Sequence, residues 1–166
     1  SKLKDVDLCN QSRSLLIAGQ EATGGFLSWA LYELAKNVAW QKQVRAELLQ
    51  LRTKSGGQLT QADVELAQYL NAHLKETMRL HPSVPIVDRT ASQDILLPLS
   101  QPISTKSGTK ITEILIKKGQ IIHCMISSFN RFNTVWGPDA ENFDPLHWIN
   151  KSRMLQGKPI GPYANM

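Results

Sequence analysis

Hydrophobic residues recur every three or four positions through the first half of the chain, with charged residues between them. This spacing is typical of helices that bury one face. Four helices are expected, each bounded by a capping residue, a glycine pair or a proline: 5–37, 39–51, 60–66 and 69–81. The first would be about 50 Å long at 1.5 Å per residue. Thr60 is the expected cap of the third helix, and Pro82 stops the fourth.

The pattern changes after Pro85, where apolar and polar residues begin to alternate. A period of two is typical of strands with faces of different polarity. Stretches of this kind, separated by Pro98, Pro102, Gly108 and Lys118-Gly119, occur at 86–90, 95–97, 111–116 and 120–126. The remainder is rich in turn residues, with one helical turn expected at 140–143 and an irregular segment over 149–166. The sequence therefore predicts a mainly α fold with a small β region.

Composition narrows the classes of protein to which the chain can belong. Its 166 residues are 42% hydrophobic and 20% charged, as in soluble globular segments. No run approaches the roughly 20 consecutive apolar residues of a bilayer-spanning helix, and nothing resembles a secretory signal. The net charge of +5 is spread along the chain without an arginine-rich, aromatic-containing run, so nucleic-acid binding is not expected. A basic face would suit an acidic partner or anionic lipid headgroups.

The ends of the chain and its two cysteines also bear on its class. Because the sequence starts at Ser1 and stops at Met166 without a terminal helix, we interpret it as a segment of a longer protein. Cys9 and Cys124 lie far apart and outside any CxxC or Cys/His spacing. We therefore expect buried free thiols, not a disulfide, and no metal ligands within the segment.

A glycine, a carboxylate and a hydroxyl lie in the middle of the long predicted helix, in the stretch Ala18 to Thr23. Glycine weakens a helix by about 0.5–1 kcal/mol relative to alanine, so Gly19 favours a local opening that frees a carbonyl to bind water. Glu21 and a neighbouring hydroxyl can then relay protons to a buried acceptor. The alternative is that Glu21 faces solvent and the glycines only allow another helix to cross closely.

An acid and an arginine lie three residues apart on the fourth predicted helix. Pairs such as Glu76 and Arg79 are usually surface ion pairs worth a few tenths of a kcal/mol. This helix is apolar, however, and runs directly into His81-Pro82-Ser83-Val84-Pro85. That setting favours a buried arginine with several hydrogen-bond partners.

The two motifs, in this order, resemble those of the cytochrome P-450 superfamily. Glu76 to Arg79 is similar to the ExxR pair of its K helix, and Ala18 to Thr23 is similar to its oxygen-binding I-helix motif. Four later stretches resemble the segment that leads to the haem loop: Lys118-Gly119, Asn130-Arg131, Trp136 to Ala140, and Phe143 to Pro145. The residue sequences of 28–34 and 136–139 resemble those of fungal members of this superfamily.

The resemblance covers essentially the whole chain and implies a partial cytochrome P-450 fold. It assigns 1–37 to the I helix, 39–54 to the J helix, 60–81 to the J′ and K helices, 85–126 to the β region and 127–166 to the approach to the meander. The loop that supplies the haem-ligating cysteine is absent, and Cys9 and Cys124 fall on other elements. The segment alone is therefore expected to be inactive, because the thiolate sets the oxygen chemistry of the iron.

The resemblance implies that Gly19, Glu21 and Thr23 lie over the distal face of a haem, where oxygen is bound and protonated. The chain departs from the family here, because the threonine usually follows the acid directly and this position is Ala22. Thr23 points about 100° further round the helix. It can replace the usual hydroxyl only if water bridges the gap or the helix is distorted.

The resemblance also implies a structural network of Glu76, Arg79 and His147. The family usually has a second arginine at the position of His147, and histidine is shorter and only partly charged at neutral pH. It can still donate one hydrogen bond to the network. Arg89 would bind a haem propionate, which suits a bidentate guanidinium, or would be a surface arginine on an edge strand.

The implied function is that of part of a haem-dependent monooxygenase with heme b as cofactor. Its partners would be molecular oxygen, a small hydrophobic organic substrate and NADPH-cytochrome P-450 reductase, and the full-length parent would lie at the endoplasmic reticulum membrane. The alternatives are a peroxide-using or isomerase-type member and a non-catalytic, truncated pseudoenzyme. Isolated, the segment is expected to expose a large apolar surface and to be poorly soluble.

Overall fold

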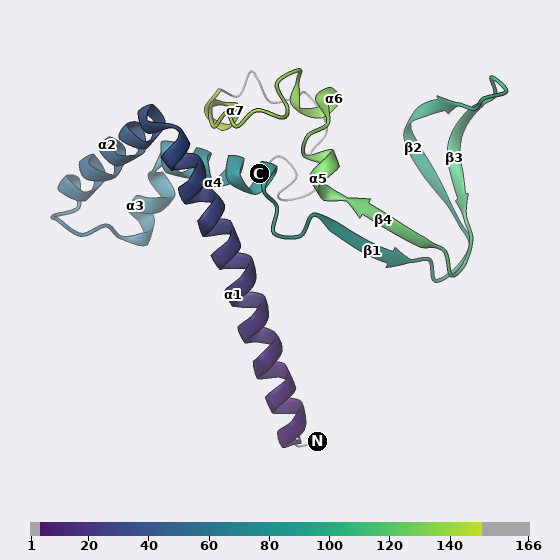
Figure 1. The fold of residues 1–166 in the computed structure, drawn as a ribbon, viewed down its shortest axis with the longest axis horizontal. Coiled ribbons are helices and arrows are strands. Elements are labelled where there is room, and N and C mark those ends of the chain that lie inside the picture. Colours follow the sequence, from purple (N-terminus) through teal and green to yellow (C-terminus); the bar gives the residue numbers. More distant parts are fainter. Residues whose placement is uncertain (1–3, 151–166) are drawn as a thin grey trace. The chain divides into compact units, whose positions relative to one another are not determined.

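The computed structural model describes residues 4–150, and the chain divides into two compact units. Unit 1 comprises Ser1–Pro85 and Ser127–Met166, and unit 2 comprises Ile86–Ile126. Helices form unit 1 (Figure 1): α1 (Asp5–Lys36), α2 (Val38–Lys54), α3 (Gln61–Leu66), α4 (Gln68–Leu80), α5 (Ile126–Phe129), α6 (Asn133–Trp136) and α7 (Leu146–Ile149). Strands form unit 2: β1 (Ile86–Thr90), β2 (Ile95–Ser104), β3 (Lys110–Ile116) and β4 (Ile121–Met125).

The four long helices agree with the sequence periodicity to within a few residues. α1 begins with Asp5 and Asp7 and ends with Lys36, charges that complement the helix dipole. It is a continuous α-helix through Gly19, so the local opening expected there is not formed. α3 begins with the predicted cap, because Thr60 and Asp63 form a reciprocal capping box.

The core of unit 1 lies where α2 meets α4. Trp40, Val44 and Ala72 are buried there, with a surrounding layer of half-buried residues: Leu34, Leu48, Tyr69, Leu70, Trp148 and Ile149. Glu47 of α2 ties the two helices together, because its carboxylate accepts the backbone N–H groups of Tyr69 at 2.9 Å and Leu70 at 3.0 Å. These amides belong to the first turn of α4, which has no side-chain cap of its own.

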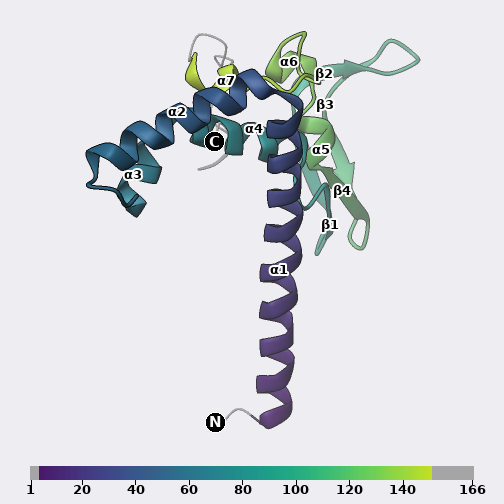
Figure 2. The same ribbon diagram turned by 60° about the vertical axis from the view of Figure 1, so that its left-hand side comes forward.

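A buried histidine connects α4 to α1. His73 Nε2 lies 2.9 Å from the backbone oxygen of Ala30, and since a carbonyl only accepts, Nε2 carries the proton. Burial lowers the pKa of His73, although the Ala30 carbonyl and the charges of Glu33 and Glu76 oppose the shift. The ring is therefore neutral when it fixes α1 against α4. Figures 1 and 2 show α2, α4 and α7 gathered at the C-terminal end of α1.

Unit 2 consists of two antiparallel pairs, β1 with β4 and β2 with β3. Gly119 precedes β4 with φ 83°, a left-handed conformation that favours glycine in a tight connection. β2 is longer than predicted, because Pro98 and Pro102 lie within it and do not end it. Proline is tolerated here because each strand has an open edge, and the pairing shifts register between Pro98 and Ile103.

The segment after unit 2 differs most from the prediction. The helical turn expected at 140–143 is only a hydrogen-bonded turn, whereas three four-residue helices, α5, α6 and α7, were not predicted. The carbonyls of Ala140 and Asn142 accept hydrogen bonds from Arg79 instead of continuing a helix. Most of the irregular segment predicted over 149–166 lies outside the described residues.

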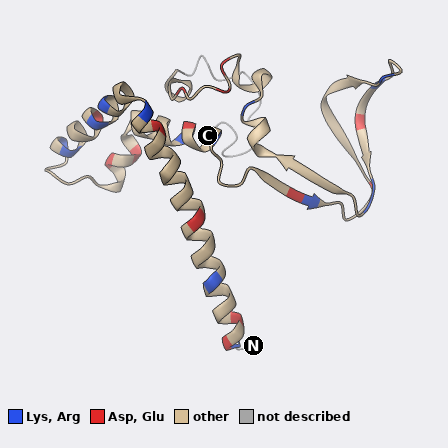
Figure 3. Ribbon diagram, viewed as in Figure 1, with Lys and Arg blue, Asp and Glu red and all other residues tan. Residues whose placement is uncertain are grey.

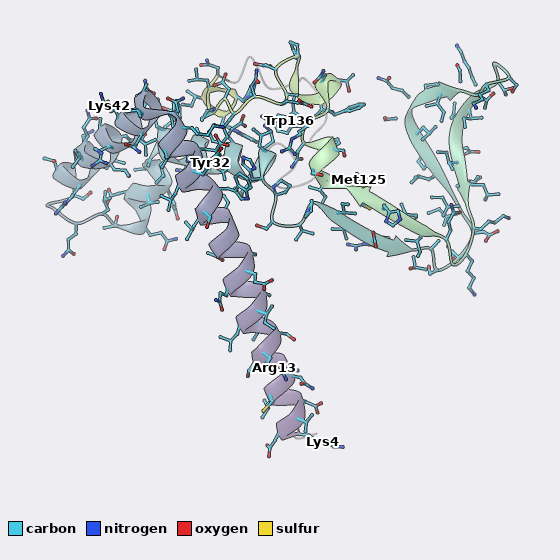
Figure 4. All side chains as sticks on the ribbon, viewed as in Figure 1. Lys4, Arg13, Tyr32, Lys42, Met125 and Trp136 are labelled. Atoms are coloured by element: carbon cyan, nitrogen blue, oxygen red, sulfur yellow. The ribbon has the colours of Figure 1, made fainter. Side chains whose placement is uncertain are left out.

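Much of the apolar surface is uncovered, including both cysteines, which were expected to be buried. Cys9 on α1 and Cys124 on β4 are free, and both side chains are exposed among the described residues. Figure 4 shows the side chains around Arg13 projecting from α1 with no other element of unit 1 beside them. Leu15 is 75% exposed and Leu16 70% exposed in this stretch. None of the described helices combines the length and apolarity needed to cross a membrane.

Candidate functional site

A bidentate ion pair between two fully buried side chains lies on α4. Arg79 Nε donates to Glu76 Oε2 at 2.9 Å, and Nη2 donates to Oε1 at 2.7 Å. The other guanidinium N–H groups donate to three backbone oxygens: Asn130 at 2.7 Å, Ala140 at 2.5 Å and Asn142 at 2.9 Å. Since a guanidinium has five N–H groups, each has a partner. Arg79 thus ties the segment 130–142 to α4.

The Glu76 carboxylate accepts three further hydrogen bonds. They come from the backbone N–H of Asp144 at 2.9 Å, from Trp148 Nε1 at 2.9 Å and from His147 Nδ1 at 3.2 Å. Burial by itself raises the pKa of Glu76, but the hydrogen bonds and charge of Arg79, with those from Asp144 and Trp148, outweigh it. The net pKa lies below its ordinary value, so Glu76 is ionised in the buried network.

His147 is buried on α7 and takes part in this network. Because the ionised Glu76 can only accept, Nδ1 of His147 carries the proton that it shares with Glu76. Nε2 of the same ring lies 3.5 Å from Asp139 Oδ2. Among the described residues, Asp139, Asp144 and His147 form the single group whose potential metal-ligating atoms all lie within 4.8 Å. His147 Nε2 makes no hydrogen bond to Asp139 or to any other described residue.

Sequence reasoning missed several members of the network. Trp148 follows His147 directly, and its indole N–H, which needs a partner when buried, was a usable signal. Arg131 was also missed: Nη2 donates to the backbone oxygen of Leu80 at the end of α4, and Nη1 donates to that of Ser127 at 3.4 Å. The carbonyls that Arg79 binds carry no side-chain signal, so nothing in the sequence could have identified them.

A hollow of about 710 Å³ lies beside α1 within unit 1. One wall is a single face of α1 with helical spacing, and the other is the loop after α4: Ile17, Ala18, Glu21, Ala22, Gly25 and Trp29, then His81, Pro82, Ser83, Val84 and Pro85. Figure 3 shows that α1 carries no charged residue between Glu21 and Glu33. The hollow is therefore mainly apolar, with Glu21 as the charged group on its α1 wall.

Only one of the three residues predicted for the distal site lines this hollow. Glu21 does, whereas Gly19 and Thr23 lie on α1 but not among the lining residues. α1 is undistorted, so successive residues differ by about 100° around the axis and Thr23 is turned away from the wall that Ala22 lines. The hydroxyl of Ser83 does lie at this wall, where Oγ donates to the backbone oxygen of Ala22 at 3.2 Å.

An aromatic and ionic cluster supports the loop at one end of the hollow. The His81 and Trp29 rings stack with centroids 4.0 Å apart and an interplanar angle of 3°. His81 Nε2 lies 3.1 Å from Glu33 Oε1, and Lys36 Nζ lies 3.2 Å from Glu33 Oε2. The first residue of the loop is thus attached to α1 by ring stacking with Trp29 and by a hydrogen bond to Glu33.

Arg89 lies on β1 in unit 2, and its side chain is exposed. Nη1 donates to the backbone oxygen of Asp88 at 2.9 Å. Asp88 Oδ1 is in turn 2.7 Å from Nδ1 of His123, its partner on β4. In unit 2 Arg89 is thus a strand arginine whose guanidinium contacts the backbone of the preceding residue.

The chain belongs to the cytochrome P450 family, whose family model matches residues 1–164. It is 39% identical to cytochrome P450 monooxygenase claO of Ampulloclitocybe clavipes, over 89% of this chain and 28% of that protein. It is 38% identical to cytochrome P450 monooxygenase 91 of Postia placenta, over 89% and 27%. It is 30% identical to a ganoderic acid synthetase of Ganoderma lucidum, over 99% and 31%.

These relatives confirm the family and the partial fold expected from the motifs, and all three are fungal. The chain spans about 28% of the length of the curated relatives it matches. The family implies a haem, and the hollow beside α1 fits one side of a flat, apolar group. Its α1 wall has the small residues Ala18, Ala22 and Gly25, and a Cβ added at Gly25 would meet nothing within 4 Å. No cysteine is among the lining residues, so the described residues fit the wall of a haem site and not its iron ligand.

Proposed function

We propose that this chain is part of a haem-dependent monooxygenase that inserts one atom of molecular oxygen into a small hydrophobic substrate. The observation that carries the proposal is the hollow that is lined both by the α1 face from Ala18 to Gly25 and by the loop after α4. The buried network of Glu76 and Arg79 lies on α4, the helix that leads into that loop. An oxygen-activating site needs both an apolar wall that limits access of water and a rigid network that holds the surrounding residues in place.

The wall of α1 would form the distal side of the site. When bound, haem supplies the iron at which oxygen is activated. Ala18, Ala22 and Gly25 leave room for a flat group to approach the helix, and Glu21 is exposed, so that it can exchange protons with water. Gly19 is proposed to lower the bulk of side chains on this part of α1. Thr23 is proposed as a hydroxyl that reaches the site only through water.

Glu76, Arg79 and His147 would have a structural role. Their network joins α4 to the segment 130–148 and thereby fixes the loop that begins at His81. In a family member this segment leads toward the loop with the iron ligand, so the network would hold the proximal side. Arg89 remains a proposed partner for a haem propionate, and its present contact with a backbone oxygen leaves its guanidinium accessible.

The remaining partners are proposed from the family as a whole. They are heme b, a hydrophobic substrate, and electrons from NADPH delivered by NADPH-cytochrome P-450 reductase, with the full-length protein at the endoplasmic reticulum membrane. One relative is named for ganoderic acid synthesis; that activity belongs to the relative and does not define the substrate here.

A second function is favoured by one observation. Ala22 carries no hydroxyl, and Thr23 does not line the hollow. A peroxide-using or isomerase-type member has less need of proton delivery from this helix, and these residues fit such a reaction. Dependence of product formation on an electron donor separates the two functions.

The test is the reduced carbon-monoxide difference spectrum of the full-length protein that contains this chain. We expect a Soret band at the position typical of thiolate-ligated haem, and substrate oxidation that requires NADPH and a reductase. Oxidation driven only by peroxide would support the second function. No haem uptake would contradict both and support the non-catalytic pseudoenzyme.

A further inference from the structure

The loop after α4 brings a hydroxyl to the place where α1 has none. Ser83 Oγ donates to the backbone oxygen of Ala22 at 3.2 Å, although the two residues are far apart in sequence. Ala22 directly follows Glu21, and both line the hollow together with Ser83. Among the described residues that line the hollow, Ser83 alone carries a hydroxyl.

Other hydroxyls on or near α1 have different surroundings. Thr23 is about 100° away from Ala22 on an undistorted helix and does not line the hollow. Ser28 also donates to an α1 carbonyl, that of Gly24 at 2.8 Å, and does not line the hollow either. Ser28 is thus bonded in the same way as Ser83 but is differently placed.

The position of Ser83 is fixed by its neighbours. The backbone N–H of His81 donates to Thr77 at 2.8 Å, and the carbonyl of Pro85 accepts from Ser127 N at 3.1 Å. Between these anchors Pro82 and Pro85 restrict the backbone. The hydroxyl is therefore held close to α1 while its Cα–Cβ and Cβ–Oγ bonds remain free to rotate.

We propose that Ser83 is the hydroxyl partner of Glu21 in proton delivery within the hollow, in the place of a hydroxyl at position 22. This inference rests on the proposed function and names a further residue of the same site. Ser83 Oγ–H is hydrogen-bonded to Ala22 at rest and rotates to donate to a ligand in the hollow. As Oγ gives up its proton it takes another through water, relayed from solvent by Glu21, which lines the same hollow. Over one catalytic cycle, neither Ser83 nor Glu21 shows a net gain or loss of a proton.

The test compares Ser83→Ala with Ser28→Ala in the full-length protein. The first readout is the infrared stretching frequency of bound carbon monoxide, which reports hydrogen-bond donors near the ligand and requires no turnover. We expect Ser83→Ala to shift this frequency and Ser28→Ala to leave it unchanged. The second readout is the ratio of oxidised substrate to released peroxide, which should fall at least about tenfold in Ser83→Ala.

Two further variants separate a chemical role from a structural one. Ser83→Thr keeps the hydroxyl and should retain both the frequency and the ratio. Ala22→Thr in the Ser83→Ala background returns a hydroxyl to the α1 wall of the hollow and should restore the ratio. A Ser83→Ala protein with unchanged frequency and ratio, or a ratio that falls only in Thr23→Ala, overturns the inference.

The same experiment distinguishes this failure from failure of the proposed function. Wild-type protein that takes up haem with a thiolate spectrum but is indifferent to Ser83→Ala contradicts only the role of Ser83. Wild-type protein that takes up no haem overturns the proposed function, and the role of Ser83 falls with it.

Discussion

Two regions of unit 1 carry the two motifs, and they differ in how completely the chain satisfies them. Around Glu76 and Arg79 every charged atom is buried, and every guanidinium N–H has a partner within the described residues. Around Glu21 the helix face is exposed, and its large apolar side chains lack neighbours. The first region is a finished structural element. The second lines an open hollow, which the proposed function makes one wall of a site.

The difference lies in whether the partners of a side chain belong to the described part of the chain. Glu76 and Arg79 need acceptors and donors that α4, α7 and the segment 130–142 supply. In the proposed function, the α1 face from Ala18 to Gly25 is covered by a haem and by additional chain. We call the surroundings of Glu76 and Arg79 the closed region, and the exposed stretch of α1 around Glu21 the open region. Substitutions in the closed region should lower the unfolding free energy. Substitutions in the open region should lower it only where additional chain covers α1.

The largest effect is expected from Arg79→Lys. Lysine keeps the charge but has three N–H donors and no planar fork, so at least two buried acceptors lose their partners. We predict a loss of at least about 3 kcal/mol in the unfolding free energy of the full-length protein, with loss of haem. Denaturant unfolding and haem content are the measurements.

The matched control for Arg79→Lys is Lys117→Ala. Lys117 Nζ lies 2.9 Å from Asp94 Oδ2, a distance close to that of the buried pair, but both side chains are more than half exposed. Water replaces that partner readily, so little change is expected. Equal losses for the two variants would contradict the distinction between the closed region and the surface.

The closed region was only partly predictable from sequence, and the reason is physical. Helical periodicity and the spacing of Glu76 and Arg79 put both on one face of α4, and the apolar setting indicated burial. The partners of Arg79 are backbone carbonyls of Asn130, Ala140 and Asn142, which any residue would offer. For the same reason a helical turn was wrongly expected at 140–143.

The open region shows a different limit. The face of α1 could be predicted from 3.6-residue periodicity, and so could the exclusion of Thr23 from the wall of Ala22. The contact from Ser83 depends on the path of the loop after α4, which is set by tertiary packing. The prolines inside β2 were misinterpreted because an edge position cannot be recognised from a single strand.

The second prediction concerns the exposed stretch of α1. Leu16 is 70% exposed in this chain and Leu66 on α3 is 73% exposed. If the rest of the full-length protein covers α1, Leu16→Ala should cost about 2–5 kcal/mol there, because a buried leucine leaves a cavity. Leu66→Ala should cost less than about 0.5 kcal/mol. Equal, small losses in denaturant unfolding would mean that the open region stays open.

The third prediction is a loss of stability in acid. The folded-state pKa of Glu76 is lowered from its ordinary value of 4.5, so its contribution is fully present above that pH. It declines as the pH falls from 4.5 toward the lowered folded value, because the unfolded state then binds the proton first. Unfolding free energies measured between about pH 6 and about pH 3 should show this decline.

Other groups titrate nearby and must be separated from Glu76. The pKa values of Asp63 and Asp94 are also lowered, mainly by hydrogen bonds from Ser55 and from the Lys118 backbone N–H respectively. The variant Asp63→Asn, Asp94→Asn removes both contributions. The lowered pKa of His73 also makes the unfolding free energy fall with pH, but this decline begins in a higher range, as the pH drops below its ordinary value of 6.5. A flat profile below pH 4.5 in that variant would contradict the role given to Glu76.

The smallest effect is expected from a comparison of two tryptophans in the core of unit 1. Trp148 Nε1 donates to Glu76 Oε2 at 2.9 Å, whereas the buried Nε1 of Trp40 has no hydrogen-bond partner among the described residues. Both lose the same atoms on replacement by phenylalanine. Trp148→Phe should cost about 1 kcal/mol more than Trp40→Phe, because only the first removes a hydrogen bond to a buried charge. Thermal unfolding of the two variants in parallel measures that difference. A larger loss of stability in Trp40→Phe would mean that the closed region depends on packing of the rings and not on completion of the Glu76 network.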